Sequence, residues 1–363
     1  MPPQRRQIEV YADWVGCNGP TLLGVLAATP QRRTEVFAFE YDAAWLSGPA
    51  VQTLDPALEL VRGPQWADQS AGNFGLFLDS SPDRWGRVLL RRREAHRARL
   101  GERPPRTLLE SDYLLGVFDG HRMGGLRFRL PGGAFLDDDM DLASPPWTSL
   151  RELEHAARRL EEDGVEDDPS YGRWLKMLLA PGRSLGGARP KAGVLDPDGS
   201  LWIAKFPSRH DEADVGAWEG VVHTLAQRAG VDTAEAKVRR FGSRHATFLT
   251  RRFDRLGTQR RHFASAMTML RRNDGDDAPA SYLDLAGVIV QQGAAPSRDL
   301  EQLWRRIVFN VCVSNVDDHL RNHGFLLAAD GWRLAPAYDM NPVAWGQGLS
   351  LDISETDNAL SLD

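Results

Sequence analysis

The pattern of hydrophobic and polar positions shows two short apolar runs in the middle of the chain, with a polar turn between them. Residues 192–195 and 201–206 are mainly apolar, and the turn-forming sequence 196–199 lies between them. The pattern predicts a strand, a tight turn and a second strand. A period of two places Ile203 and Lys205 on the same face of the second strand. A lysine on such an apolar face needs an anionic partner.

A helical period follows this hairpin. Apolar residues recur at a spacing of three to four over residues 215–229, and Gly230 ends the pattern. Glu219 lies beside the apolar face of this predicted helix, where it is a possible partner of Lys205. A solvent-exposed helix glutamate is an equally good interpretation. Residues 247–250 then read as a strand.

Near the C-terminus, a predicted helix over residues 300–309 leads into a polar loop. Two predicted strands, 324–327 and 332–334, follow the loop with a turn between them. We expect a loop followed by a hairpin to bring polar side chains from the two ends of this segment close together, at the opening of one site.

Three residues of this segment have the spacing found in enzymes of phosphoryl transfer. Asp317 and Asn322 are five positions apart, and Asp339 follows the hairpin. Kinases use one carboxylate to accept a hydroxyl proton, and an asparagine and a second aspartate to hold Mg²⁺. The segment therefore predicts a kinase catalytic loop.

Two other interpretations of the same loop stay open at this point. Asp, Asn and His in loops are often only turn formers and helix caps. Alternatively, Asp317, His319, His323 and Asp339 have the chemistry of metal ligands, as in a metal-dependent hydrolase.

A glycine-rich loop precedes the first hairpin. Gly186 and Gly187 would let the backbone approach a phosphate closely, and Ser184 and Lys191 flank them. No Gly-Lys-Ser/Thr sequence opens a helix here, so the loop is not a Walker motif. The chain has 44 Lys and Arg residues, of which four are lysines, and two of these, Lys191 and Lys205, fall in the predicted phosphate site. A compact ammonium is thus used where the rest of the chain uses arginine.

Taken in order, these motifs resemble the HipA family of serine/threonine kinases, the toxins of type II toxin–antitoxin modules. The resemblance rests on five segments of the kinase unit and on similar segments of the N-terminal part: 184–191, 203–207, 252–255, 315–322 and 337–339, with 23–26, 39–46, 112–116 and 124–128.

The resemblance implies a role for each candidate residue. Asp317 would be the catalytic base, Asn322 and Asp339 the Mg²⁺ ligands, and Lys205 the contact to ATP phosphates. Other residues implied in nucleotide binding are Ser184, Gly186, Gly187, Lys191 and Phe253, the last of these at the adenine hinge. Ser184 would also be autophosphorylated, which ejects the loop and inhibits the enzyme.

The resemblance further implies a two-lobed, kinase-like α/β (α+β) fold with an N-terminal mixed β-rich subdomain. It implies ATP and Mg²⁺ as cofactors and a helix-turn-helix antitoxin as partner. DNA would be bound mainly through that antitoxin, and the substrate would be a protein, for which a translation component is one candidate. One departure is Arg251, at a hinge position where the best-known member has an acid. A second function consistent with these motifs is a catalytically impaired corepressor that binds the antitoxin.

Composition sets limits on the domains and the location. We expect an N-terminal subdomain over 1–140, a linker with a charged helix over 141–170, and a kinase core over 171–363. For the early C-terminal end of this core, truncation and a short variant are both open interpretations. A net charge of −6 argues against broad nucleic-acid affinity.

Cys17 and Cys312 are the only cysteines, so a disulfide framework is excluded. No signal sequence or apolar run of membrane length is present, and a cytoplasmic protein without membrane contact is expected.

One local exception to the acidic composition is a predicted helix over residues 84–99. It carries seven arginines together with Trp85, Leu89 and Leu90. Such a stripe is usually a solvated face, and docking of a partner or of DNA is the alternative.

Overall fold

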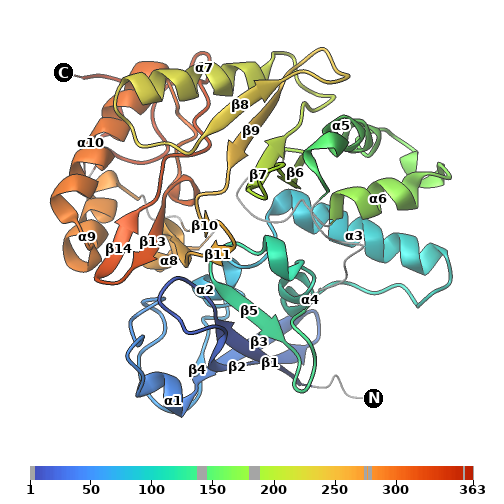
Figure 1. Ribbon diagram of the computed structural model, residues 1–363, viewed down its shortest axis with the longest axis vertical. Coiled ribbons are helices and arrows are strands. Elements are labelled where there is room, and N and C mark those ends of the chain that lie inside the picture. Colours follow the sequence, from blue (N-terminus) through green and yellow to red (C-terminus); the bar gives the residue numbers. More distant parts are fainter. Residues whose placement is uncertain are drawn as a thin grey trace.

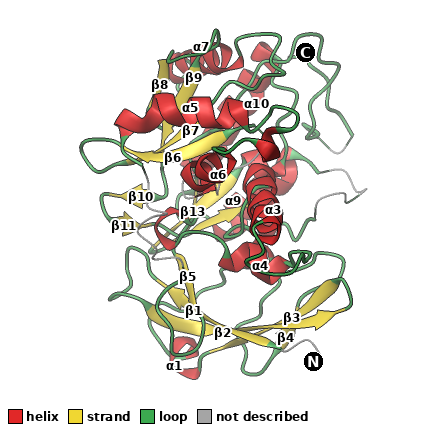
Figure 2. Cartoon of the chain, turned by 90° about the vertical axis from the view of Figure 1, so that its right-hand side faces the viewer, coloured by secondary structure: helices red, strands yellow, loops and turns green. Residues whose placement is uncertain are grey.

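The computed structural model describes residues 5–136, 145–179, 189–273, 276, 280–354 and 356–362. An N-terminal body built on one antiparallel sheet lies at one end of the molecule, and two further lobes lie beyond it (Figure 1). Helices α3 (Arg84–Arg99), α5 (Leu150–Arg159) and α6 (Tyr171–Leu179) lie along the side of the molecule that faces the viewer in Figure 2. Within the described residues, no helix is both long enough and apolar enough to cross a membrane.

The N-terminal sheet has five antiparallel strands in the order β4-β3-β2-β1-β5. These strands are β1 (Arg6–Ala12), β2 (Thr21–Gln31), β3 (Thr34–Tyr41), β4 (Gln65–Trp66) and β5 (Leu126–Arg129). Three short helices accompany the sheet: α1 (Ala43–Leu46), α2 (Gly75–Leu78) and α4 (Glu110–Leu115). The alternation of buried and exposed positions along β1 and β3 follows the period of two, because one face of the sheet covers the core.

The smaller lobe contains the predicted hairpin and helix. Its sheet has the order β6-β7-β9-β8, with all neighbours antiparallel. The elements are β6 (Lys191–Leu195), β7 (Leu201–Lys205), α7 (Val215–Arg228), β8 (Ala236–Arg239) and β9 (Thr247–Arg251). The pattern of the sequence did not indicate β8, whose four residues are only partly buried because it forms the edge of the sheet.

The larger lobe carries the polar loop. It contains the short hairpin β10 (Arg255–Leu256) and β11 (Gln259–Arg260), and the sheet β12 (Phe263–Ser265), β13 (Gly324–Ala328) and β14 (Gly331–Leu334). Its helices are α8 (Ala266–Met269), α9 (Tyr282–Gln292) and α10 (Pro296–Val313). Helix α10 is longer than the predicted 300–309, because Pro296 begins it at a position where a missing N–H costs nothing.

The arginine-rich segment is helix α3 (Arg84–Arg99), which packs on α6 (Tyr171–Leu179), while α6 also packs on α5 (Leu150–Arg159). Several arginines of α3 bind other parts of the same chain. Arg87 pairs with Glu110, Arg92 donates to the carbonyl of Leu160, and Arg99 pairs with Asp167. The charges of α3 thus help to hold the helices together.

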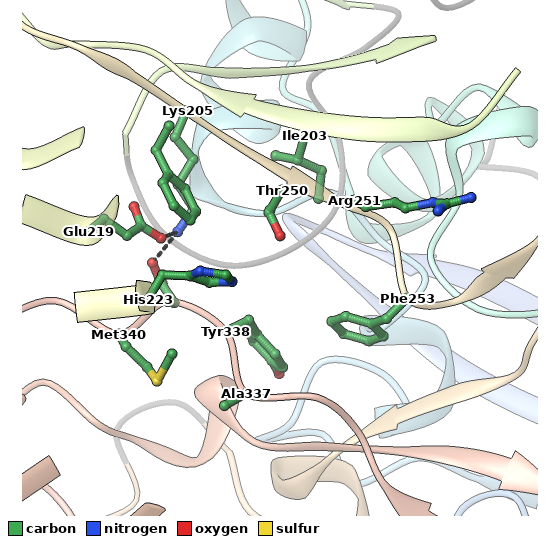
Figure 3. Close-up of a pocket in the computed structure, with 12 residues that line it drawn as sticks. Ile203, Lys205, Glu219, His223, Thr250, Arg251, Phe253, Ala337, Tyr338 and Met340 are labelled. Atoms are coloured by element: carbon green, nitrogen blue, oxygen red, sulfur yellow. Dashed lines mark hydrogen bonds and ion pairs between the residues drawn. The ribbon is translucent and has the colours of Figure 1, made fainter. Parts of the chain in front are cut away.

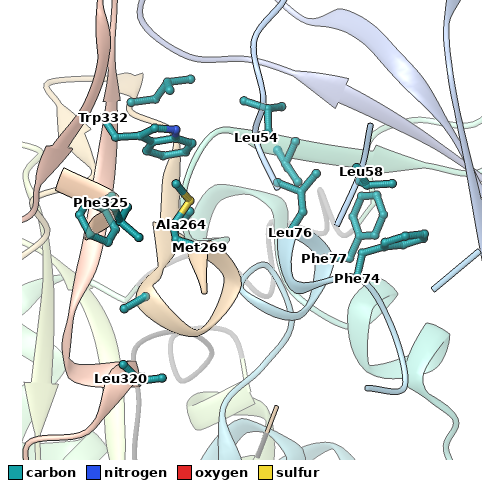
Figure 4. Packing of buried hydrophobic residues seen from close by; sticks show 14 of the residues in the cluster. Leu54, Leu58, Phe74, Leu76, Phe77, Ala264, Met269, Leu320, Phe325 and Trp332 are labelled. Carbon is teal, nitrogen blue, oxygen red and sulfur yellow. The ribbon is translucent and has the colours of Figure 1, made fainter. Parts of the chain in front are cut away.

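Two large apolar clusters hold these parts together. The first joins the N-terminal sheet to the larger lobe, and Figure 4 shows Leu76 and Phe77 on one side of it and Met269 and Phe325 on the other. The second packs α3, α5 and α6 against the smaller lobe, with Trp202 fully buried. Both lobes are therefore packed on N-terminal elements. The division of the chain at residues 140 and 170 stays a prediction.

Candidate active site

A pocket lies between the smaller lobe and the segment that follows β14. Its cavity volume is about 30 Å³ and it opens to solvent, so the space between the two walls is narrow in this structure. Its wall is formed by β7, α7, β9 and the following hinge, and residues 337–340; the lining side chains are Ile203, Lys205, Glu219, His223, Phe248, Thr250, Arg251, Phe253, Ala337, Tyr338, Asp339 and Met340 (Figure 3). Ile203 and Lys205 face it together, as the period of two requires.

The ammonium of Lys205 joins three elements at one end of this pocket. Its Nζ lies 2.5 Å from Oε1 of Glu219 on α7 and 2.6 Å from Oδ1 of Asp339. The lysine side chain is 12% exposed and that of Glu219 is 5% exposed. A charge buried to this degree is stable only with opposite charges beside it. Lys205 therefore links the strand, the helix and the segment that contains Asp339.

Burial and charge act in opposite directions on the ionisation of these groups. Burial alone would lower the pKa of Lys205, but Asp339 and Glu219 raise it on balance, so the ammonium stays charged. Burial alone would raise the pKa of Asp339, but Lys205 lowers it on balance, so the carboxylate stays ionised. For Glu219 burial prevails over Lys205 and raises the pKa.

The backbone at Asp339 is unusual. Its φ angle is +59°, in the left-handed region that non-glycine residues rarely adopt. Such conformations cost free energy and are typical of sites where a side chain must point in a required direction. Here the direction is toward Lys205.

The loop after α10 presents Asp317 and Asn322. Asp317 is exposed, and its carbonyl oxygen accepts a hydrogen bond of 3.0 Å from Nδ2 of Asn322. The other amide atom, Oδ1 of Asn322, is buried and has no hydrogen-bond partner among the described residues. A buried oxygen without a partner is costly, which makes it a candidate ligand for a cation. Neither residue lines the pocket between the lobes.

A buried polar network holds this loop from behind. Oδ2 of Asp318 accepts hydrogen bonds from the Tyr282 hydroxyl at 2.5 Å, from Nδ2 of Asn310 at 2.8 Å, and lies 2.8 Å from Nε2 of His323. Burial alone would raise the pKa of Asp318, but His323, the Tyr282 hydroxyl and the charge of Arg306 lower it on balance. Asp318 faces the interior and its neighbour Asp317 faces solvent, so the network fixes the direction of Asp317.

This network bears on the interpretation of the loop as a hydrolase metal site. His323 is buried, and its Nε2 faces Asp318 in the interior and not the loop surface. Among the described residues, no group of three or more His, Cys, Asp or Glu side chains is placed to hold a metal ion. The geometry does not support a hydrolase centre at Asp317, His319, His323 and Asp339.

The hinge at Phe253 is held by its charged neighbours. Asp254 is fully buried and accepts hydrogen bonds of 2.6 Å from both Arg252 and Arg255 and of 2.9 Å from the amide of Gly124. Burial alone would raise the pKa of Asp254, but the two arginines lower it to about 2. The motif thus ties the hinge to the N-terminal part and directs Phe253 toward the pocket, where its ring lies 5.5 Å from that of Tyr338.

Arg251 lines the same pocket, but its guanidinium is turned away from it (Figure 3). The side chain donates to Oγ of Ser200 at 2.8 Å and pairs with Glu235 at 3.6 Å. A ligand at the hinge therefore meets the backbone of Arg251, and the change from an acid at this position acts mainly outside the pocket.

Lys191 is placed differently from Lys205. It is buried, and its Nζ lies 2.8 Å from Oδ2 of Asp83, at the N-terminus of α3. It does not line the pocket, although its charge helps to lower the pKa of Asp339. Its predicted contact with a nucleotide stays a prediction. Ser184, Gly186 and Gly187 lie outside the described residues.

Sequence reasoning missed several residues of the pocket. His223, Thr250, Tyr338 and Met340 line it, and the hydroxyl of Tyr338 donates to the carbonyl of Arg321 at 2.7 Å. The position of Tyr338 directly before Asp339 was the one available signal. Thr250 and His223 lie on faces of β9 and α7 that only the packing of the lobe defines, and Met340 lies directly after Asp339.

Comparison with known proteins agrees with this arrangement. The family model of the HipA-like C-terminal domain matches residues 183–362. Among solved structures, a chain of the complex of HipA, HipB and operator DNA from Shewanella oneidensis MR-1 matches with a TM-score of 0.66 and 18% identity, over 97% of this chain and 81% of that chain. No curated protein sequence matches significantly.

A second solved structure, the proinflammatory kinase CtkA of Helicobacter pylori, matches at 16% identity with a TM-score of 0.37, over 47% of this chain and 69% of that chain. That similarity is too low to bear on the fold. The expected two-lobed, kinase-like fold with a β-rich N-terminal part is confirmed by the HipA match. The chain therefore belongs to the HipA family, with a HipA-like C-terminal domain over residues 183–362.

Proposed function

We propose that this protein is an ATP- and Mg²⁺-dependent serine/threonine protein kinase that acts as the toxin of a toxin–antitoxin module. The observation that carries the proposal is the contact of Lys205 with both Glu219 and Asp339 at one end of the interlobe pocket. A strand lysine paired with a helix glutamate beside a metal-binding aspartate is the arrangement that positions ATP phosphates in protein kinases.

The residues divide into a binding part and a reacting part. Lys205 would contact the phosphates, with Glu219 fixing its position, and the ring of Phe253 would lie against the adenine. Asp317, exposed and held by the Asp318 network, would accept the proton of the substrate hydroxyl. The acceptor would be a serine or threonine of another protein.

The residues present fit a bound Mg²⁺. Oδ1 of Asn322 is buried without a partner, and the pKa of Asp339 is lowered, so both offer the oxygen ligands that this cation prefers. When bound, Mg²⁺ neutralises charge on the phosphates during transfer. Asn322 and Asp339 would hold it.

A thermal-shift titration tests nucleotide binding. ATP with Mg²⁺ is expected to raise Tm by several degrees, because a ligand at a hundredfold excess over Kd stabilises the native state by about 2.7 kcal/mol. The shift should be largely lost when EDTA replaces Mg²⁺. An equal shift in EDTA would remove the metal from the site.

The toxin role is supported by the solved HipA structure, which contains HipB and operator DNA. We propose that a helix-turn-helix antitoxin binds this chain in the same way and that DNA is reached mainly through that partner. If the protein binds Mg²⁺-ATP but transfers no phosphate to any protein, the impaired corepressor becomes the better interpretation.

Autophosphorylation of Ser184 is the next prediction. Incubation with Mg²⁺-ATP is expected to add a single phosphate at Ser184 and to abolish ATP binding, because the phosphate adds about 1.5 to 2 negative charges beside the nucleotide phosphates. Ser184→Ala should stay active longer, and Ser184→Asp should be weak from the start. Intact mass and peptide mapping measure this; a phosphate elsewhere, with activity lost, argues against Ser184.

A further inference from the structure

Helix α7 has two apolar faces. One face is buried: Val222 and Ala226 pack against the larger lobe, beside Glu219. The other face is exposed, with Trp218 at 54%, Val221 at 48% and Leu225 at 43%. The sequence pattern had combined Trp218 and Leu225 with Val222 and Ala226 into one apolar face, but the larger lobe covers only Val222 and Ala226 and leaves the other two exposed.

The exposed residues form a continuous stripe at the outer edge of the molecule. Their spacing of three and four places them in one row along two turns of helix. Val238 on the edge strand β8 is 39% exposed and widens the row, because Gly220 lacks the side chain that would separate β8 from α7. In Figure 1, α7 runs along the upper rim of the molecule. Contiguous apolar surface of this kind marks an interaction site.

The stripe is symmetric about the middle of its helix. Helix α7 spans Val215–Arg228, so its midpoint falls between residues 221 and 222, and the midpoint between Trp218 and Leu225 falls at the same place. A twofold axis through this point would place Trp218 of one helix on Leu225 of an antiparallel copy. Two-fold interfaces require this self-complementarity.

The ends of the helix are complementary in charge in the same arrangement. Arg228 is the last residue of α7, and Glu212 lies just before its start; both are exposed. Neither forms an ion pair within the part of the chain that the structure describes. Pairing about this axis places Arg228 of one copy opposite Val215 of the other, three residues from Glu212. The basic end of each helix thus lies near the acidic start of its partner, twice per dimer, and the antiparallel arrangement of the two helix dipoles is also favourable.

We propose that the stripe formed by Trp218, Val221, Leu225 and Val238 is the interface of a homodimer, in which two α7 helices pack antiparallel. The contact is short, so the dimer is weak, with a Kd of about micromolar order. Because Glu219 lies on the opposite face of α7, the dimer contact would support the helix that positions Lys205. The surface itself does not depend on the proposed kinase activity.

Sedimentation of the full chain at concentrations from about 1 to about 100 µM tests the dimer. The wild type is expected to change from monomer to dimer over this range. Trp218→Glu and Leu225→Glu should each remain monomeric, while Trp304→Glu, at a tryptophan 62% exposed on α10, should dimerise as the wild type does.

A charge exchange tests the antiparallel register. Arg228→Glu should weaken the dimer at least about tenfold, and the double variant Arg228→Glu with Glu212→Arg should restore it. A wild type that stays monomeric throughout would overturn the proposal and leave another protein as the occupant of the stripe. A dimer that Trp218→Glu leaves intact, or that Trp304→Glu dissociates, would overturn it as well. Thermal unfolding confirms that each variant is folded.

Discussion

Replacing Asp317 with asparagine is expected to lower the rate of phosphoryl transfer by about 10²- to 10⁴-fold, the range typical of a lost general base. ATP affinity should change by no more than about twofold. The groups that bind ATP equally well before and during the reaction do not include the base. Asp317 is exposed and does not line the interlobe pocket, which separates it from the residues that would bind the nucleotide. Single-turnover transfer and ATP titration measure the two quantities independently.

The matched control for this variant is Asp330→Asn. Asp330 is an exposed aspartate on the turn between β13 and β14, and the substitution makes the same change in charge. It should leave both transfer and affinity unchanged. Transfer by Asp317→Asn at the wild-type rate would exclude Asp317 as the base. A parallel loss of ATP affinity would mean that Asp317 binds the nucleotide or its metal.

Replacing Lys205 with arginine is expected to lower kcat/KM by about 100-fold or more, although the charge is kept. The ammonium occupies a space in which Glu219 and Asp339 approach it to 2.5 and 2.6 Å. A planar guanidinium is larger and cannot take the same position between two carboxylates from different elements. It would displace α7, the Asp339 segment or both.

Lys237→Arg is the control, because Lys237 lies on β8 of the same lobe and is only partly buried. It should retain kinetic constants close to those of the wild type. Lys205→Met would leave Glu219 buried and Asp339 half-buried without their counter-ion, at a cost of about 3 kcal/mol in stability. If Lys205→Arg binds and turns over ATP as the wild type does, the assignment of Lys205 to the phosphates is wrong.

Local features of this chain could be predicted from its sequence. The hairpin of β6 and β7 follows from two short apolar runs with a turn between them, and the orientation of Lys205 follows from the period of two of a strand. The extent of α3 follows from the spacing of its apolar residues within an arginine-rich segment. In these cases the residues that decide the structure are neighbours in the chain.

Contacts between distant segments could not be predicted in this way. The pairing of Lys191 with Asp83 joins residues 108 positions apart, and nothing in either segment indicates the other. Similarly, the burial of Asp318 by Tyr282 and Asn310 depends on how α9 packs on α10. A loop aspartate that faces the interior and one that faces solvent look alike in the sequence.

The two faces of α7 show the same limit in a helix. Periodicity indicates which residues are apolar, but Val222 is buried and Leu225 is exposed because only one side of the helix meets the larger lobe. Tertiary packing decides between such residues, and the sequence pattern alone assigned both to one face.

Incorporation of label from radioactive ATP tests the central claim most directly. The protein would be incubated with Mg²⁺ and ATP labelled at either the γ or the α phosphate, and label on protein would be measured after denaturation. The account predicts label from the γ position alone, present in the wild type, dependent on Mg²⁺, and reduced about 10²-fold or more by Asp317→Asn. Label from the α position, or no label on a wild type that binds Mg²⁺-ATP, would contradict it.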